Sequence, residues 1–147
     1  MDDDMRPVLN QLNLVVQDMD ATVAFYRRLG LAIDTEPGAQ HAATTLPTGM
    51  VVEFDSTDFV AHWDAGWGGG TGGSTILGFS LSSRAAVDEL YGELTGVGYR
   101  GHQRPYDAFW GSRYAIVEDP DGNAVGLMSP ADPARNYWPP QRPPPGP

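Results

Sequence analysis

The chain has 147 residues, a formal net charge of −10 and no cysteine. This length predicts one domain, and the lack of cysteine excludes disulfides and thiolate metal sites and fits a reducing cytoplasm. No apolar run is long enough to cross a membrane, and the acidic N-terminus lacks the residue order of a signal peptide. The charge disfavours nucleic acid and anionic membrane as partners, so it serves either solubility or a neutral or cationic small ligand.

The first part of the chain, about residues 7–55, predicts a compact α+β unit. Asp18 or Asp20 is suited to cap a helix, and Gly30 is suited to end it. Alternating apolar residues predict strands on either side of that helix. The expected elements are a strand at 8–16, a helix at 21–29, a strand at 31–35, and a hairpin with strands at 41–46 and 50–55.

A glycine-rich segment, residues 56–73, follows this unit. It contains Trp63 and Trp67 and ends in five glycines and one threonine, so it has too few apolar residues to form a core of its own. It lacks the Gly-Lys-Ser/Thr ending of a phosphate-binding loop. Two interpretations remain open, a linker or a lid that carries aromatic side chains.

The second part of the chain, about residues 74–129, repeats the order of the first. Ser82 or Ser83 is suited to cap its helix. Asp119-Pro120-Asp121-Gly122-Asn123 predicts the turn of a closing hairpin. The tail, residues 130–147, holds eight of the thirteen prolines and predicts neither helix nor central strand. The expected elements are a strand at 75–82, a helix ending at 95, a strand at 99–104, and a hairpin over 114–128.

The two parts align with each other. At a spacing of 65, Tyr91 falls on Tyr26, and at a spacing of 73, Gly126 falls on Glu53. Each part alone is too small for a stable core. The repeat therefore predicts two tandem βαβββ units that form one curved eight-stranded sheet around a central cavity.

Two motifs carry a resemblance to a known family. They are Val-Val-Gln-Asp at 15–18 before the helix that contains Ala-Phe-Tyr-Arg-Arg-Leu-Gly-Leu at 24–31, and Val-Glu-Asp-Pro-Asp-Gly-Asn at 117–123. Over residues 8–128 the chain resembles the vicinal oxygen chelate superfamily, which includes glyoxalase I, extradiol dioxygenases, and fosfomycin- and bleomycin-resistance proteins. The resemblance implies a single domain of paired βαβββ units.

The resemblance also implies four metal-ligand positions. Carried over from glyoxalase I, they fall on Gln11, Glu53, Ile76 and Gly126, and the last two offer no donor atom. Two protein ligands rarely hold a catalytic metal. We therefore expect no metal cofactor, the alternative being a weakly bound divalent metal at Gln11 and Glu53. His41, His62 and His102 do not obviously complete the set.

Strand parity predicts that four polar side chains point into the cavity: Gln11, Asn13, Glu53 and Ser80. A carboxylate in a half-apolar cleft is costly unless it is paired. Glu53 therefore pairs with an arginine, meets a cationic ligand, or holds a proton readily enough to act as a general base. The alternative is that Glu53 only bonds Gln11 and water, without further function.

The segment Phe109–Tyr114 resembles the Trp-Gly loop at the cavity mouth of bleomycin-resistance proteins. Trp110 and Tyr114 are candidates to stack on a flat ligand, and Arg113 to pair with a carboxylate. Alternatively, Trp110 only packs the two halves together.

Two functions follow from these expectations. The favoured one is a metal-independent protein that sequesters an aromatic or cationic compound in an acidic cavity. The alternative is a glyoxalase-like lyase or isomerase that uses Glu53 as its base. Members of the superfamily commonly pair, so we also expect a homodimer in the cytoplasm.

Overall fold

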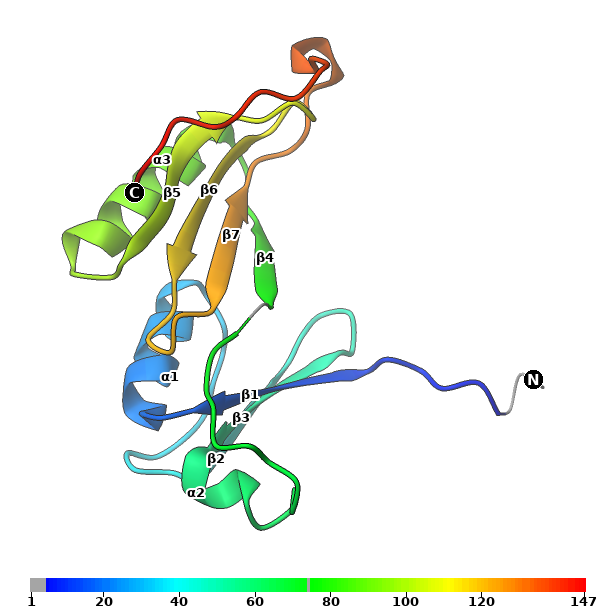
Figure 1. Ribbon diagram of the computed structural model, residues 1–147, viewed down its shortest axis with the longest axis vertical. Helices are drawn as coiled ribbons and strands as arrows, with labels where there is room; N and C mark the ends of the chain where they lie inside the picture. The colour runs from blue at the N-terminus through cyan, green and yellow to red at the C-terminus, as the bar shows by residue number, and fades with distance from the viewer. Residues whose placement is uncertain (1–4, 74) are drawn as a thin grey trace. The chain divides into compact units, whose positions relative to one another are not determined.

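The computed structural model describes residues 5–73 and 75–147, which belong to two compact units, Met1–Gly72 and Gly73–Pro147 (Figure 1). Both units combine helices with a β-sheet, so the predicted α+β class is confirmed. The boundary between them falls inside the glycine-rich segment. None of the helices in the described residues has the length and apolar character needed to cross a bilayer.

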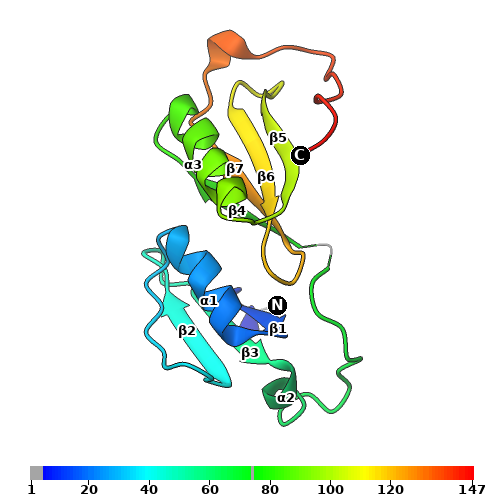
Figure 2. The ribbon, with the colours of Figure 1, turned by 90° about the vertical axis from the view of Figure 1, so that its left-hand side faces the viewer.

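Unit 1 contains a three-stranded sheet in the order β1-β3-β2. β3 lies in the middle, parallel to β1 and antiparallel to β2. Helix α1 covers one face of this sheet (Figure 2). The elements are β1 (Gln11–Val16), α1 (Met19–Arg28), β2 (His41–Thr45), β3 (Val51–Ser56) and α2 (Thr57–Val60).

The core of unit 1 forms where α1 meets the sheet. Asp18 caps α1, since its side chain accepts a hydrogen bond from the Ala21 backbone N–H at 3.0 Å. Tyr26 of α1 packs against Phe54 of β3 with ring centroids 5.4 Å apart, and both are fully buried. Because side chains alternate along a strand, the residues on either side of Phe54 face away from α1. This alternation leaves the opposite face of the sheet available for polar side chains.

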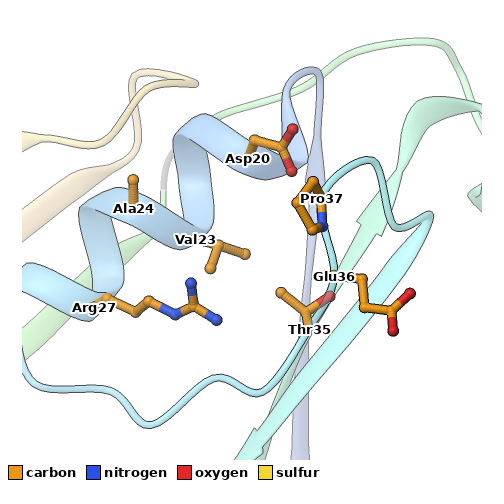
Figure 3. Close-up of a pocket in the computed structure, with 7 residues that line it drawn as sticks. All are labelled: Asp20, Val23, Ala24, Arg27, Thr35, Glu36 and Pro37. Atoms are coloured by element: carbon orange, nitrogen blue, oxygen red, sulfur yellow. The ribbon is translucent and has the colours of Figure 1, made fainter.

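The strand predicted at 31–35 is wrong, because these residues form no strand. The Arg27 guanidinium donates hydrogen bonds to the carbonyl of Ile33. The Asp20 carboxylate accepts one from the backbone N–H of Gly38 at 3.0 Å. Figure 3 shows the surface pocket that this loop forms with α1. Side chains of the helix thus satisfy backbone groups that a sheet would otherwise bind.

Helix α2 was not predicted from the glycine-rich segment. Ser56 caps it through a hydrogen bond from the Phe59 backbone N–H at 3.1 Å. Val60 at its end is buried. A single capped turn with one buried side chain is therefore enough to order the start of a segment that composition assigns to a linker or lid.

Unit 2 is a complete βαβββ unit with a four-stranded sheet in the order β4-β7-β6-β5. β4 is parallel to β7, and the other neighbours are antiparallel. Helix α3 lies across one face of the sheet (Figure 2), with Val87 and Leu94 buried. The elements are β4 (Ile76–Ser80), α3 (Arg84–Gly96), β5 (Gly101–Asp107), β6 (Arg113–Glu118) and β7 (Ala124–Met128).

The predicted hairpin joins β6 to β7. The Asp119 carboxylate accepts hydrogen bonds from the backbone N–H groups of Asp121 and Asn123, both at 2.9 Å, and Gly122 has a φ of 83°. The tail contains only a 3-10 turn, η2 (Pro133–Arg135). Over the described residues the strands number seven in two sheets, so the single eight-stranded sheet is not confirmed.

Candidate functional site

A polar cluster occupies the face of the unit 1 sheet opposite α1. Asn13 of β1 stands beside Glu53 of β3 in the parallel register. The Asn13 amide donates hydrogen bonds to Glu53 at 3.0 Å and to Asp55 at 2.8 Å. The Gln11 amide donates to Glu53 at 3.0 Å. The structure therefore brings together three of the predicted site residues and adds a second carboxylate, Asp55.

His41 completes this cluster from β2, where it is the register partner of Asp55. The His41 Nδ1 and Asp55 Oδ1 atoms are 2.6 Å apart. Asp55 is only 1% exposed, whereas the His41 side chain is 40% exposed. A buried carboxylate needs such partners, and Asp55 has two, the imidazole and the Asn13 amide.

Sequence reasoning missed His41 and Asp55 as site residues. The signal for Asp55 was present, since it follows Glu53 by two residues on one strand and so shares its face. His41 required the hairpin register, because only the antiparallel pairing with β3 brings it next to Asp55.

The pocket over this cluster has a volume of about 240 Å³. Phe59 of α2 and Trp63 just after it form its aromatic wall, and the Phe59 ring centroid is 5.6 Å from that of His41. The polar residues in the lining are Gln11, Asn13, His41, Glu53 and Asp55.

No arginine forms an ion pair with Glu53 or Asp55 among the described residues, and the chain has no lysine to do so. Within residues 5–73 and 75–147, the basic group next to these carboxylates is the His41 imidazole. The first of the expected pairings for Glu53, an arginine, is therefore not formed. The pocket combines two adjacent carboxylates with aromatic rings.

The other predicted site residues lie in unit 2. Ser80 is exposed at the end of β4. Arg113 begins β6 and pairs with Asp88 at 2.9 Å and with Asp107 at 3.2 Å. Because its guanidinium is bound by two carboxylates of the protein, Arg113 is not an unpaired cation awaiting an anionic ligand.

Trp110 and Tyr114 belong to a row of aromatic rings in unit 2. The Tyr114 ring lies 5.3 Å from Trp110 and 6.3 Å from Tyr106, both edge-on. Burial raises the pKa of the Tyr114 phenol above its ordinary value. Burial also raises the pKa of Tyr106, helped by the neighbouring phenols of Tyr114 and Tyr137. The phenols of Tyr106 and Tyr114 therefore stay neutral at ordinary pH.

Comparison with known proteins identifies the family. Residues 8–127 match the model of the glyoxalase/bleomycin resistance protein/dioxygenase superfamily. The chain belongs to this superfamily. It is also 31% identical, over 140 residues, to the uncharacterized protein PA2024 of Pseudomonas aeruginosa, with 82% of this chain and 87% of that protein covered.

Solved structures of the superfamily share this fold. A glyoxalase-related enzyme from Fulvimarina pelagi has a TM-score of 0.72 at 20% identity, covering 84% of this chain and 88% of its own. A glyoxalase/bleomycin resistance protein/dioxygenase from Nocardioides has a TM-score of 0.66 at 23% identity, covering 86% and 85%. A lactoylglutathione lyase from Agrobacterium tumefaciens has a TM-score of 0.61 at 20% identity, covering 85% and 95%.

The ligand positions that the superfamily resemblance implies are poorly matched in unit 2. Ile76 is apolar and 60% exposed. Gly126 has no side chain, and a Cβ added there would lie 2.7 Å from the Tyr114 phenol oxygen. A tyrosine ring thus fills the space of the fourth ligand. In unit 1, by contrast, donor atoms of His41, Glu53 and Asp55 all lie within 4.8 Å of one another.

Proposed function

We propose that this superfamily member binds a small, positively charged aromatic compound on the polar face of unit 1 and sequesters it. The observation that carries the proposal is the pair of carboxylates, Glu53 and Asp55, which share one amide donor and have no arginine partner among the described residues. Two adjacent negative charges repel each other, and a bound cation relieves that repulsion.

The walls of the pocket support an aromatic ligand. Phe59 and Trp63 present rings beside the carboxylates, and ring faces attract both flat ligands and cations. A volume of about 240 Å³ accommodates one small planar compound rather than a large one. The carboxylates supply the opposite charge themselves, so this binding requires no metal ion.

The test is a calorimetric titration of protein freed of metal with EDTA, using a planar aromatic cation such as proflavine. We expect Glu53→Gln to weaken binding about tenfold, or about 1.4 kcal/mol, because it removes a charged partner of the ligand. Glu36→Gln removes an equal charge from the same unit outside the pocket and should leave binding unchanged. Equal affinities in the wild type and both variants would refute the proposal.

A second function, a glyoxalase-like lyase or isomerase, is favoured by one detail of Glu53. Both amide donors bind its Oε2 atom, so Oε1 has no hydrogen-bond partner among the described residues. An oriented carboxylate with one unengaged oxygen is suited to take a proton from a carbon next to a carbonyl group. The test measures how fast the wild-type protein exchanges that carbon-bound proton of a carbonyl compound for deuterium from solvent. Glu53→Gln should lose this exchange, and retained exchange would exclude Glu53 as the base.

A further inference from the structure

We propose that His41, Glu53 and Asp55 form a complete binding site for a divalent transition-metal ion within unit 1 alone. The inference rests on the proposed function, since the metal would use the same carboxylates that are proposed to bind an organic cation. The proposed site differs from the four positions over two units that the superfamily resemblance implies, because His41 and Asp55 are at none of those four positions.

The donor geometry carries the inference. Each of the three residues contributes an atom, and the atoms lie within 4.8 Å of one another, so small side-chain movements bring all three onto one ion. Two strands fix them: Glu53 and Asp55 lie on one face of β3, and His41 is paired with Asp55 from β2.

The closest pair of donors must separate slightly when the ion binds. His41 Nδ1 and Asp55 Oδ1 are 2.6 Å apart as hydrogen-bond partners. Two ligands about 2.0–2.1 Å from a tetrahedral ion are about 3.3 Å apart. For this pair the required shift is under about 1 Å, and the exposed His41 ring is the group that can make it.

The donor chemistry selects the class of ion. Carboxylates alone favour magnesium, calcium or manganese, whereas an added imidazole favours zinc, copper, iron or nickel. Three protein ligands also leave positions open for water or a substrate oxygen, as at catalytic metal sites. The ion and an organic cation would occupy the same carboxylates, so we expect them to compete.

The experiment titrates untagged, EDTA-treated full-length protein with zinc or nickel alone, followed by calorimetry, with magnesium for comparison. We expect one ion per chain for zinc and nickel, with magnesium at least tenfold weaker. His41→Ala, Glu53→Gln and Asp55→Asn should each weaken zinc at least tenfold. His102→Ala, which removes an exposed imidazole beside Glu118, is the matched control and should bind zinc as the wild type does.

Two results would overturn the proposal: no binding of zinc or nickel at millimolar concentration, or one-to-one binding that His41→Ala leaves unchanged. Loss of binding in His62→Ala alone would equally assign the ion to another site. Because Asp55 is buried, its variant is accepted only if its thermal unfolding remains cooperative, while the exposed His41 variant keeps the proposal testable in any case. Organic-cation binding is measured in EDTA, so each proposal can fail without the other.

Discussion

Gly126→Ala tests whether the Tyr114 ring is the reason that the fourth implied ligand position holds a glycine. The added Cβ would lie 2.7 Å from the Tyr114 phenol oxygen and 3.1 and 3.2 Å from two ring carbons. Contacts this short force the Tyr114 ring or β7 to move, and overpacking of this kind costs about 1–3 kcal/mol. At about 2–4 °C for each kcal/mol, we expect the melting temperature to fall by about 2–12 °C.

The neighbouring strand offers a matched control. Gly78 of β4 is the register partner of Gly126, and a Cβ added there would meet nothing within 4 Å. Gly78→Ala should therefore leave the melting temperature unchanged or raise it slightly. In a Tyr114→Ala background the cost of Gly126→Ala should disappear, a non-additivity that calorimetry detects. Additive effects of the two changes would show that the ring does not fill the position.

Three further predictions concern unit 2. Below the unfolded pKa of Tyr114, about 10, both the folded and the unfolded chain keep the phenol proton, so the raised folded pKa does not change the stability. Between that value and the higher folded pKa only the unfolded chain loses the proton, so the melting temperature should fall as pH rises. The fall should be smaller in Tyr114→Phe. Asp119→Ala removes a buried acceptor from two backbone N–H groups and should lower the free energy of unfolding by about 2–4 kcal/mol in a urea titration, a loss that Asp119→Asn should partly restore. Ser83→Ala removes the N-cap of α3 and should cost about 1 kcal/mol in the same assay, whereas Ser82→Ala should cost nothing; equal costs would contradict the cap assignment.

Most of the fold was predictable because its signals are local. The hairpin turn at 119–123, the cap at Ser83 and the alternation along β1 and β3 depend on residues close in sequence. The strand predicted at 31–35 failed because tertiary contacts decide that segment. Arg27 and Asp20, both on α1, form hydrogen bonds with backbone groups of the loop. The residues 31–35 themselves give no sign of these partners.

Only the site residues that strand alternation places on one face of the sheet could be predicted from the sequence. Parity and the repeat placed Gln11, Asn13 and Glu53 on one face, and hydrogen bonds link them there. His41 joins them because a hairpin folds it onto Asp55, and a register is not readable from composition. The ion pair between Arg113 and Asp88 could likewise not be predicted, since Asp88 lies on α3 and Arg113 on β6.

The pairing registers show how the two repeated units differ in the side chains at equivalent positions. Asn13 is the partner of Glu53 in unit 1, and Gly78 is the partner of Gly126 in unit 2. These are equivalent positions, because the same spacings of 65 and 73 residues relate them. Where unit 1 sets an amide beside a carboxylate, unit 2 sets two glycines side by side, and the Tyr114 ring lies against Gly126. The proposed cation binding on this face therefore concerns unit 1, whereas the same face of unit 2 carries aromatic packing. Changes at Glu53 should alter cation binding, while changes at Gly126 should alter stability.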